Sequence, residues 1–330
     1  SGGIPINVRM ETLPLGAENE LEKINLRLLP QPVSSGEHGH KRLEDIGYAP
    51  EDLNLIKDVL YKNATGLFIN SGPTGAGKTT SLYAQIHFLL DSMDEPLTVI
   101  TIDDPIEIRD YDFCQVQVRS ANSEELSLTP AKILKASLRS DPDIILYNEI
   151  RDAKAATVAM QASSTGHRVF STVHAADCIR TISRLLDFDI SKTTLLSELK
   201  LIVSQRLLAK LCPHCSQPHT LTEQEKRVLS EEDLAILIMH APDLRERGTK
   251  EARAACPRCQ HGFIGRTAIA EFVPFTMKLR DMLLGRHSFS QIHAALKAEG
   301  YRSMWEKGID MVANGIIELD ELIHVVGKEE

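Results

Sequence analysis

The residues best suited to chemistry form a glycine-rich loop, SGPTGAGKTT, at residues 71–80. Residues 72–79 fit G-x-x-x-x-G-K-[ST], a pattern whose backbone N–H groups and following helix N-terminus surround phosphates. In such loops the lysine, here Lys78, reaches the β- and γ-phosphates, and the next hydroxyl, here Thr79, binds Mg²⁺. The pattern predicts a nucleoside-triphosphate site. Its residues are Gly72, Pro73, Thr74, Gly75, Ala76, Gly77, Lys78, Thr79 and Thr80.

Two acidic segments could act on the bound phosphates. The first, IDDPIE, holds Asp103, Asp104 and Glu107, and the second, NEIRD, holds Glu149. Each follows an apolar, strand-like run, and a parallel sheet gathers its ligands at the carboxyl ends of its strands. Carboxylates there hold Mg²⁺ or polarise the water that attacks the γ-phosphate. An acid in this place could instead cap the next helix, but Asp152 is the better cap, which favours catalysis for Glu149.

His174 ends another strand-like segment, RVFSTVH. A histidine at that edge of a sheet could sense the γ-phosphate, or it could be a hydrogen-bonded residue with a structural role. The residues alone leave both interpretations open.

Four of the six cysteines occur as two C-x-x-C pairs, CPHC and CPRC. No secretory signal is visible at the start, so we expect a reducing compartment, where structural disulfides are rare. Two pairs then suit one tetrahedral Zn²⁺ site, and four thiolates leave no open position for catalysis. A redox dithiol is the alternative, although it would not need two copies. The predicted zinc ligands are Cys212, Cys215, Cys256 and Cys259, whereas the nearby His214, His219 and His261 are not expected to be ligands.

Alternating strands and helices must position these residues. The strand-like segments are 66–70, 97–104, 143–150 and 168–174, and the helical segments are 43–60, 81–90, 152–164, 177–186 and 193–211. This alternation predicts an α/β fold with a mainly parallel sheet flanked by helices. A further helical stretch is expected around EQEKRVLSEEDLAILIMH, and small helices are expected from residue 276 onward.

Length and charge set broader limits. A chain of 330 residues suggests roughly two domains. A net charge of −9 argues against a surface that binds duplex nucleic acid. No segment approaches the roughly 18 apolar residues that a bilayer span requires.

Residues 4–30 alternate apolar and polar positions and are predicted to form two strands. A linker that contains Pro, Ser and Gly follows at 32–40.

The ordered motifs resemble those of the secretion ATPases, the hexameric motors of type II secretion and type IV pilus assembly. The motifs are the phosphate loop, TIDDPIE, LRSDPDIILYNEIRD, QASSTGHRVFSTVHAAD, QRLLAKLCPHC and GRTAIAEF. The resemblance covers nearly the whole chain. The paired CPHC and CPRC look like the zinc module of the assembly and secretion branch, which pilus-retraction ATPases generally lack.

The resemblance implies a domain organisation. Residues 1–31 would be the trailing strands of a PAS-like domain, 32–40 the linker, and 41–330 a RecA-like ATPase domain. That domain would include a zinc module at 212–259 and C-terminal helices at 276–330.

The resemblance also implies an activity and partners. The protein would hydrolyse ATP to ADP and phosphate as a cytoplasmic homo-hexamer that is peripherally associated with the inner membrane. It would drive a membrane platform protein that lifts pilin-like subunits, and no nucleic acid would be needed.

The family's functional residues carry over by motif position. Lys78 and Thr79 would be the Walker A residues, Glu149 the Walker B acid and His174 the histidine-box residue, and TIDDPIE would be the aspartate box. Four arginines are candidates for contacts with the phosphates or with neighbouring subunits. They are Arg9 and Arg27, which in the family approach the phosphates when the subunit closes, together with Arg151 and Arg266.

Three departures from the family pattern bear on the hydrolysis rate. The family usually has glutamate, its favoured general base, where Asp103 stands, and aspartate is one methylene shorter. Direct activation of water by Asp103 would therefore need a shifted strand end or a relaying water. Asn148 replaces a glycine beside Glu149, and STVHAAD replaces a more common STLHTND around His174.

Two other functions are compatible with the same residues. A RecA-like nucleic-acid translocase with a zinc ribbon would be stimulated by DNA or RNA, but the chain shows no basic–aromatic stripe. A nucleotide-binding assembly scaffold with weak catalysis would fit the aspartate at position 103.

Overall fold

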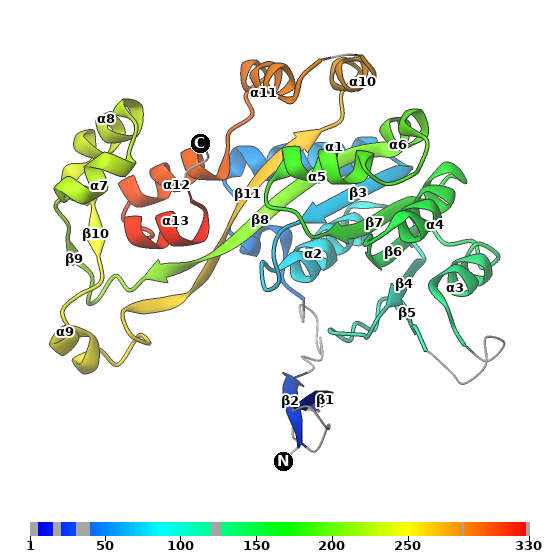
Figure 1. The fold of residues 1–330 in the computed structure, drawn as a ribbon, viewed down its shortest axis with the longest axis horizontal. Helices are drawn as coiled ribbons and strands as arrows, with labels where there is room; N and C mark the ends of the chain where they lie inside the picture. Colours follow the sequence, from blue (N-terminus) through cyan, green and yellow to red (C-terminus); the bar gives the residue numbers. More distant parts are fainter. Residues whose placement is uncertain (1–5, 16–20, 31–39, 120–126, 286, 328–330) are drawn as a thin grey trace.

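The structure is a computed structural model that describes residues 6–15, 21–30, 40–119, 127–285 and 287–327 (Figure 1). Its centre is a seven-stranded sheet of order β11-β8-β3-β7-β6-β4-β5. The strands are β3 (Gly66–Ser71), β4 (Val99–Asp103), β5 (Cys114–Gln117), β6 (Ile144–Glu149), β7 (Arg168–Val173), β8 (Leu199–Leu211) and β11 (Phe263–Pro274). All neighbours pair in parallel except β11, which is antiparallel to β8, so the predicted mainly parallel α/β sheet is confirmed.

Helices cover both faces of this sheet (Figure 1). One face packs against η1 (Leu43–Ile46), α1 (Pro50–Lys62) and α2 (Lys78–Ser92). The other packs against α3 (Pro130–Ser137), α4 (Ala153–Ser164), α5 (Cys178–Leu186), α6 (Lys192–Glu198), α10 (Met277–Leu284) and α11 (Phe289–Ala298). Because side chains alternate along a strand, Leu67 and Ile69 of β3 face the second layer while Phe68 faces the first.

Side-chain caps fix where several of these helices begin. The Asp152 carboxylate accepts the Ala155 N–H at 2.8 Å, which confirms the predicted cap of α4. Asp177 caps α5 in the same way through the Arg180 N–H. These caps satisfy backbone donors that a helix N-terminus leaves unpaired.

The predicted helix over 193–211 is wrong in its second part. Helix α6 ends at Glu198, and β8 occupies residues 199–211. Leucine, lysine and alanine favour a helix locally, but here the backbone pairs with β3 on one side and β11 on the other. The backbone hydrogen bonds to these two neighbouring strands outweigh the small helix propensities. The motif GRTAIAEF lies in β11.

A smaller unit follows β8. It contains β9 (Gln217–Pro218), α7 (Glu223–Val228), α8 (Glu231–Met239), η2 (Ala241–Asp243), β10 (Arg245–Glu246) and α9 (Lys250–Ala255). A third apolar cluster packs Leu237 of α8 against Trp305 and Ile309 of α12 (Met304–Ala313) and against residues of α13 (Leu319–Val325). The Trp305 Nε1–H donates to Asp233 at 3.0 Å, so this unit is held to the C-terminal helices by apolar and polar contacts.

The two strands predicted at the start of the chain form the antiparallel pair β1 (Ile6–Leu15) and β2 (Leu21–Pro30). Arg9 lies directly opposite Arg27 in this register. The side chains of both strands lie outside the described part of the structure, as do residues 32–39 of the predicted linker.

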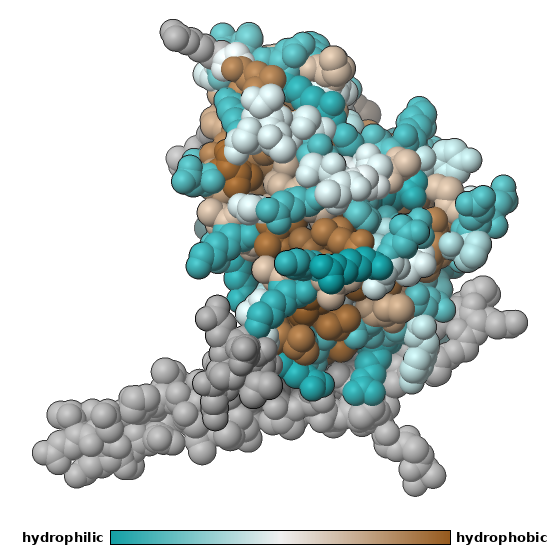
Figure 2. All heavy atoms as spheres, turned by 90° about the vertical axis from the view of Figure 1, so that its right-hand side faces the viewer, coloured by the Kyte–Doolittle hydropathy of each residue, from teal (hydrophilic) through white to brown (hydrophobic). Residues whose placement is uncertain are grey.

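The surface around α3, α4 and β5 mixes polar and apolar side chains (Figure 2). A hollow of about 310 Å³ lies between β4, β6, α3 and α4. Its lining includes Val118, Ala131 and Val158, and it extends to Asn148 and Glu149.

Among the described residues, no helix combines the length and apolar character needed to cross a bilayer.

Candidate nucleotide site and cysteine cluster

The phosphate loop connects β3 to α2, as the sequence predicts. Gly72, Gly75 and Gly77 all have positive φ, and Gly77 directly precedes α2. At Gly72 a Cβ would lie 2.5 Å from the carbonyl oxygen of Gln205, so a side chain has no room there. The loop therefore needs glycine for both its conformation and its approach to β8.

Lys78 folds back over this loop. Its Nζ donates to the carbonyl oxygens of Gly72 and Pro73, at 2.9 and 3.0 Å. Burial lowers the pKa of Lys78, and the carboxylates of Glu149 and Glu107 act against that shift. The ammonium group is thus held at the loop, beside two acids.

An open cavity of about 400 Å³ brings the predicted residues together. Residues of the phosphate loop meet the ends of β6 and β7 and the segment after β4. The predicted residues that line it are Thr74, Gly75, Ala76, Gly77, Lys78, Thr79, Thr80, Asp104, Glu107, Glu149, Arg151, His174 and Arg266.

Glu149 links two of the predicted residues within this cavity. Its Oε2 accepts the Arg151 Nε–H at 2.8 Å, and its Oε1 lies 3.3 Å from His174 Nε2. Burial and the nearby Lys78 ammonium lower the pKa of His174, with the Glu149 carboxylate opposing the shift, so that the neutral imidazole is favoured. A neutral histidine can donate to, or accept from, a group at the γ-phosphate position.

A second acid contacts the first turn of α2. The Thr79 hydroxyl donates to Glu107 Oε2 at 3.3 Å. A hydroxyl and a carboxylate are hard oxygen ligands of the kind that Mg²⁺ prefers. Asn148, which stands where the family has glycine, donates to the Asp104 carbonyl at 3.4 Å and so connects the two acidic segments.

Asp103 lies outside the lining of this cavity. Strand alternation points it, like Val99, toward the α2 layer, where the Thr101 hydroxyl donates to its carboxylate. Its side chain is buried, and the residue is 6% exposed. Burial raises its pKa to about 6, with Glu107 adding to the shift and the Thr101 hydrogen bond opposing it. The neighbours Asp104 and Glu107, rather than Asp103, reach the cavity.

Gln205 supports the phosphate loop, a role that the sequence analysis missed. This buried residue of β8 donates from Nε2 to the Ala76 carbonyl at 2.6 Å, and its Oε1 accepts the Tyr48 hydroxyl at 2.6 Å. Gln205 is the first residue of the motif QRLLAKLCPHC, which is the sequence feature that could have indicated its role. Because residues 193–211 are predicted to be helical, the sequence does not indicate that Gln205 contacts the loop.

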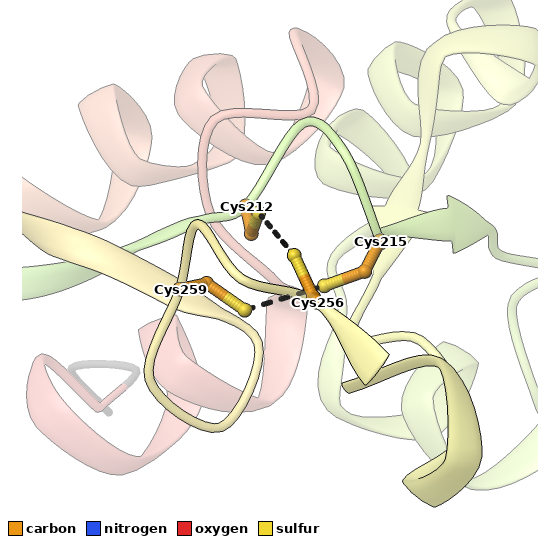
Figure 3. Close-up of side chains that lie close together, drawn as sticks. All are labelled: Cys212, Cys215, Cys256 and Cys259. Atoms are coloured by element: carbon orange, nitrogen blue, oxygen red, sulfur yellow. Dashed lines mark hydrogen bonds between the residues drawn. The ribbon is translucent and has the colours of Figure 1, made fainter. Parts of the chain in front are cut away.

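The four paired cysteines converge near the end of β8 and the start of β11 (Figure 3). The Sγ atoms of Cys212 and Cys256 are 3.9 Å apart, those of Cys215 and Cys259 are 3.6 Å apart, and all four lie within 4.8 Å of one another. Tetrahedral thiolates at 2.3 Å from zinc would be separated by about 3.8 Å, so the cluster fits Zn²⁺.

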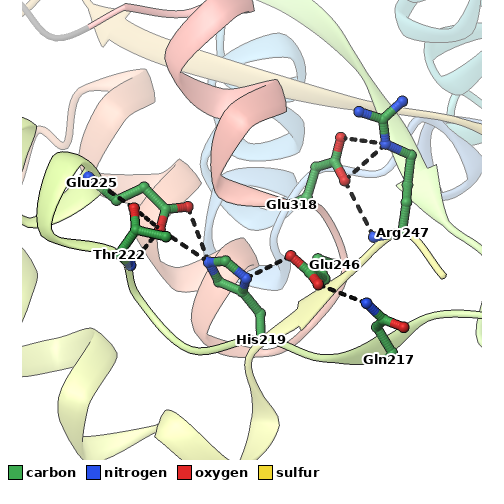
Figure 4. Close-up of polar contacts among 7 residues, drawn as sticks. All are labelled: Gln217, His219, Thr222, Glu225, Glu246, Arg247 and Glu318. Atoms are coloured by element: carbon green, nitrogen blue, oxygen red, sulfur yellow. Dashed lines mark hydrogen bonds and ion pairs between the residues drawn. The ribbon is translucent and has the colours of Figure 1, made fainter. Parts of the chain in front are cut away.

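Two of the neighbouring histidines have partners outside the cysteine cluster. His219 Nδ1 lies 2.7 Å from Glu246 and its Nε2 lies 2.9 Å from Glu225, which ties α7 to β10 (Figure 4). His214 accepts from Arg258. Among the residues that the structure describes, the group that could hold a metal ion here consists of the four cysteines.

Fold and site together define a class of protein. A phosphate loop between a buried strand and a helix, facing an acid on a neighbouring parallel strand, is the arrangement of P-loop nucleotide-binding proteins. The chain belongs to the family described as Type II/IV secretion system protein, whose profile matches residues 2–324.

Relatives agree with this assignment and confirm the resemblance. The Type II secretion system protein E of Pseudomonas aeruginosa is 33% identical over 329 residues, covering 99% of this chain and 60% of that protein. The Type IV pilus assembly ATPase PilB of the same organism is 31% identical over 322 residues, covering 97% of this chain and 52% of that protein. The chain thus spans between half and two thirds of the length of these relatives.

Solved structures show the same fold. The pilus retraction motor PilT with bound ADP matches with a TM-score of 0.61 at 22% identity, covering 92% of this chain and 70% of that one. The ATPase DotB of Legionella pneumophila matches with a TM-score of 0.61 at 18% identity, covering 96% and 71%.

The burial of Asp103 predicts a pH-dependent stability. Its pKa of about 6 in the folded protein exceeds the usual aspartate value, so its stabilising contribution is complete at low pH and is lost as the pH rises through 6. Asparagine cannot ionise. From pH 5 to pH 8, the unfolding free energy of Asp103→Asn relative to wild type should therefore rise by about 1–2 kcal/mol in urea titrations. The exposed Asp58→Asn is the control, and a pH-independent difference for Asp103→Asn would contradict the assignment.

The cysteine geometry predicts about one Zn²⁺ per chain by elemental analysis. Cys215→Ser should lose the ion and lower the melting temperature, because structural zinc contributes to the free energy of folding. Each kcal/mol lost should lower it by about 2–4 °C. The matched control is Cys114→Ser, an exposed cysteine outside the cluster. Equal zinc content in both variants would rule out the site.

Proposed function

We propose that the chain is the ATPase part of a motor that drives assembly of a type IV pilus or a type II secretion pseudopilus. The observation that carries the proposal is the cavity in which the phosphate loop faces Glu149, His174 and Glu107. Relatives named for type II secretion and type IV pilus assembly support the biological setting.

The residues suggest how ATP would be held. The backbone N–H groups of the loop and the N-terminus of α2 bind the phosphates, and Lys78 leaves the loop carbonyls to reach the β- and γ-oxygens. Thr79 and Glu107 would supply oxygen ligands for Mg²⁺, whose charge would neutralise that of the phosphates. With ATP held in this way, the γ-phosphate would point toward the end of β6, where Glu149 lines the cavity.

Glu149 is the proposed acid that orients the attacking water. It is a partly buried carboxylate within contact of His174, and both face the Lys78 side of the cavity. Glu149 pairs with Arg151, and opening of this ion pair would free the guanidinium to contact a phosphate oxygen. Asp103, the proposed general base by family position, would act through a relaying water or a shifted end of β4, because its side chain faces the α2 layer.

Positive charge from outside the loop would complete the site. Arg266 lines the cavity from β11 and is proposed to contact a nucleotide or a neighbouring subunit. Arg9 and Arg27 are proposed to approach the phosphates when the β1–β2 segment closes on the ATPase domain. Charge of this kind offsets charge on the transferring phosphoryl group.

The partners are part of the same proposal. We assign a homo-hexamer at the cytoplasmic face of the inner membrane, coupled to a membrane platform protein, with residues 1–31 ending a PAS-like domain and 41–330 forming the RecA-like ATPase domain. Zn²⁺ in the cysteine cluster would hold the module at 212–259 in shape. The apolar side chains on the α3–α4 face agree with burial in an oligomer.

Removal of the Lys78 ammonium tests the proposed activity. Lys78→Ala should weaken binding of a fluorescent ATP analogue at least about tenfold and reduce Mg²⁺-dependent phosphate release to background, because the variant lacks the ammonium group that would reach the β- and γ-phosphates from within the loop. The control is Lys62→Ala, whose exposed side chain pairs with Asp58. Undiminished hydrolysis in Lys78→Ala would refute the site.

The nucleic-acid translocase is tested in the same assay. The proposed motor should hydrolyse ATP at the same rate with and without single-stranded DNA, duplex DNA or RNA. Severalfold stimulation by any of them, at more than one salt concentration, would favour the translocase instead.

A further inference from the structure

A second group of metal-binding side chains lies away from both the cavity and the cysteines. It consists of His40, which precedes η1, His87 on α2, and Asp110 and Asp112 in the connection between β4 and β5. One ligand atom from each of His40, His87 and Asp112 lies within 4.8 Å of the others. Neither the family motifs nor the proposed function uses these residues.

His87 is the fixed member of this group. Its side chain is 3% exposed, and its Nε2 lies 2.7 Å from Asp110 Oδ2. Asp110 is itself held, because its Oδ1 accepts the Asp112 N–H at 3.1 Å and its own N–H donates to Gln115 at 3.0 Å. A proton on Nε2, facing the carboxylate, leaves the lone pair on Nδ1.

That lone pair faces a second carboxylate. His87 Nδ1 lies 4.0 Å from Asp112 Oδ2, and the Asp112 side chain is 64% exposed. This separation is too long for a hydrogen bond. It also exceeds the roughly 3.3 Å expected between nitrogen and oxygen ligands about 2.0 Å from one tetrahedral ion, so the exposed Asp112 side chain would have to move inward to share an ion with His87. The buried Asp110 therefore directs the free nitrogen of His87 toward an accessible oxygen.

His40 supplies the third donor. Its ring stacks on His87 with centroids 3.5 Å apart and an interplanar angle of 1°. Because an imidazole lone pair lies in the ring plane, one ion can bind both rings only if the stack tilts open. His40 is half-buried and lies at the start of the described ATPase region, whereas His87 is enclosed, so His40 is the ring that would turn.

We infer that His40, His87 and Asp112 form a binding site for a divalent transition-metal ion, with Asp110 orienting His87. Two imidazole nitrogens and one carboxylate oxygen suit Zn²⁺, Co²⁺ or Ni²⁺ rather than Mg²⁺, and water completes the coordination. The contact of Asp110 with the far nitrogen of His87 is the carboxylate–histidine–metal arrangement that fixes a ligand's tautomer and ring orientation.

The position of this site suggests what the ion does. It joins the segment before η1 to α2, which begins with Lys78, and to the β4–β5 connection, which contains Glu107. A bound ion stabilises the contact between the start of the ATPase region and the two elements that flank the phosphates. The site and its metal affinity do not depend on the proposed motor function.

The test is a Co²⁺ titration of tag-free protein whose cysteine cluster is filled with Zn²⁺. Wild type should bind one Co²⁺ with the weak visible absorption of nitrogen and oxygen ligands, without the strong thiolate-to-cobalt bands that exchange into the cysteine cluster would produce. The added ion should also raise the melting temperature, since it binds only the folded chain.

Three variants separate the ligands from a purely structural network. His40→Ala and Asp112→Asn change accessible side chains and should abolish the bound Co²⁺ and its thermal shift. Asp110→Asn should weaken Co²⁺ binding by about 10–100-fold while keeping the ligands. The control is His324→Ala, an exposed histidine of α13 that should bind as wild type does.

Two results would overturn the inference. One is the lack of any Co²⁺ uptake by wild type beyond the cysteine cluster at metal concentrations of about 100 µM, which corresponds to affinities too weak to be specific. The other is equal binding and an equal thermal shift in wild type, His40→Ala and Asp112→Asn, which would assign the four residues to a metal-free hydrogen-bonded network.

Discussion

The close approach of the phosphate loop to β8 is the contact on which the nucleotide site depends. Gly72 meets the Gln205 backbone where a side chain has no room, and the Gln205 amide holds Ala76 while accepting the Tyr48 hydroxyl. These contacts hold the loop against β8, directly before α2 begins at Lys78. Parallel pairing of β3 with both β7 and β8 keeps this support in register with the strand ends that carry the acids.

The sequence predicted the parts of the site whose signals are local. The phosphate loop, the cap at Asp152 and the two C-x-x-C pairs each depend on spacing within a few residues, and the structure places them as expected. The strand β8 was not predictable in the same way. Its leucines and lysines fit a helix, and only the ladders to β3 and β11, formed with residues far away in the chain, decide for a strand.

The same limit explains Asp103 and the histidine cluster. Whether Asp103 or Asp104 faces the cavity depends on the phase of strand alternation, which a run of apolar residues buried on both faces does not reveal. The contact between His40 and His87 joins separate elements and leaves no spacing pattern in the chain. The arginines of β1 and β2 are another case, because their proposed role depends on the proposed closing of the β1–β2 segment on the ATPase domain.

The central claim is that Glu149 acts on a phosphate held by the loop, and Glu149→Gln tests it most directly. Glutamine keeps the shape but loses the charge that polarises water. In single-turnover experiments this variant should bind Mg²⁺–ATP within about threefold of wild type while hydrolysing it at least about 100-fold more slowly. Hydrolysis at the wild-type rate, with binding intact, would contradict the assignment of Glu149 and with it the account of this site.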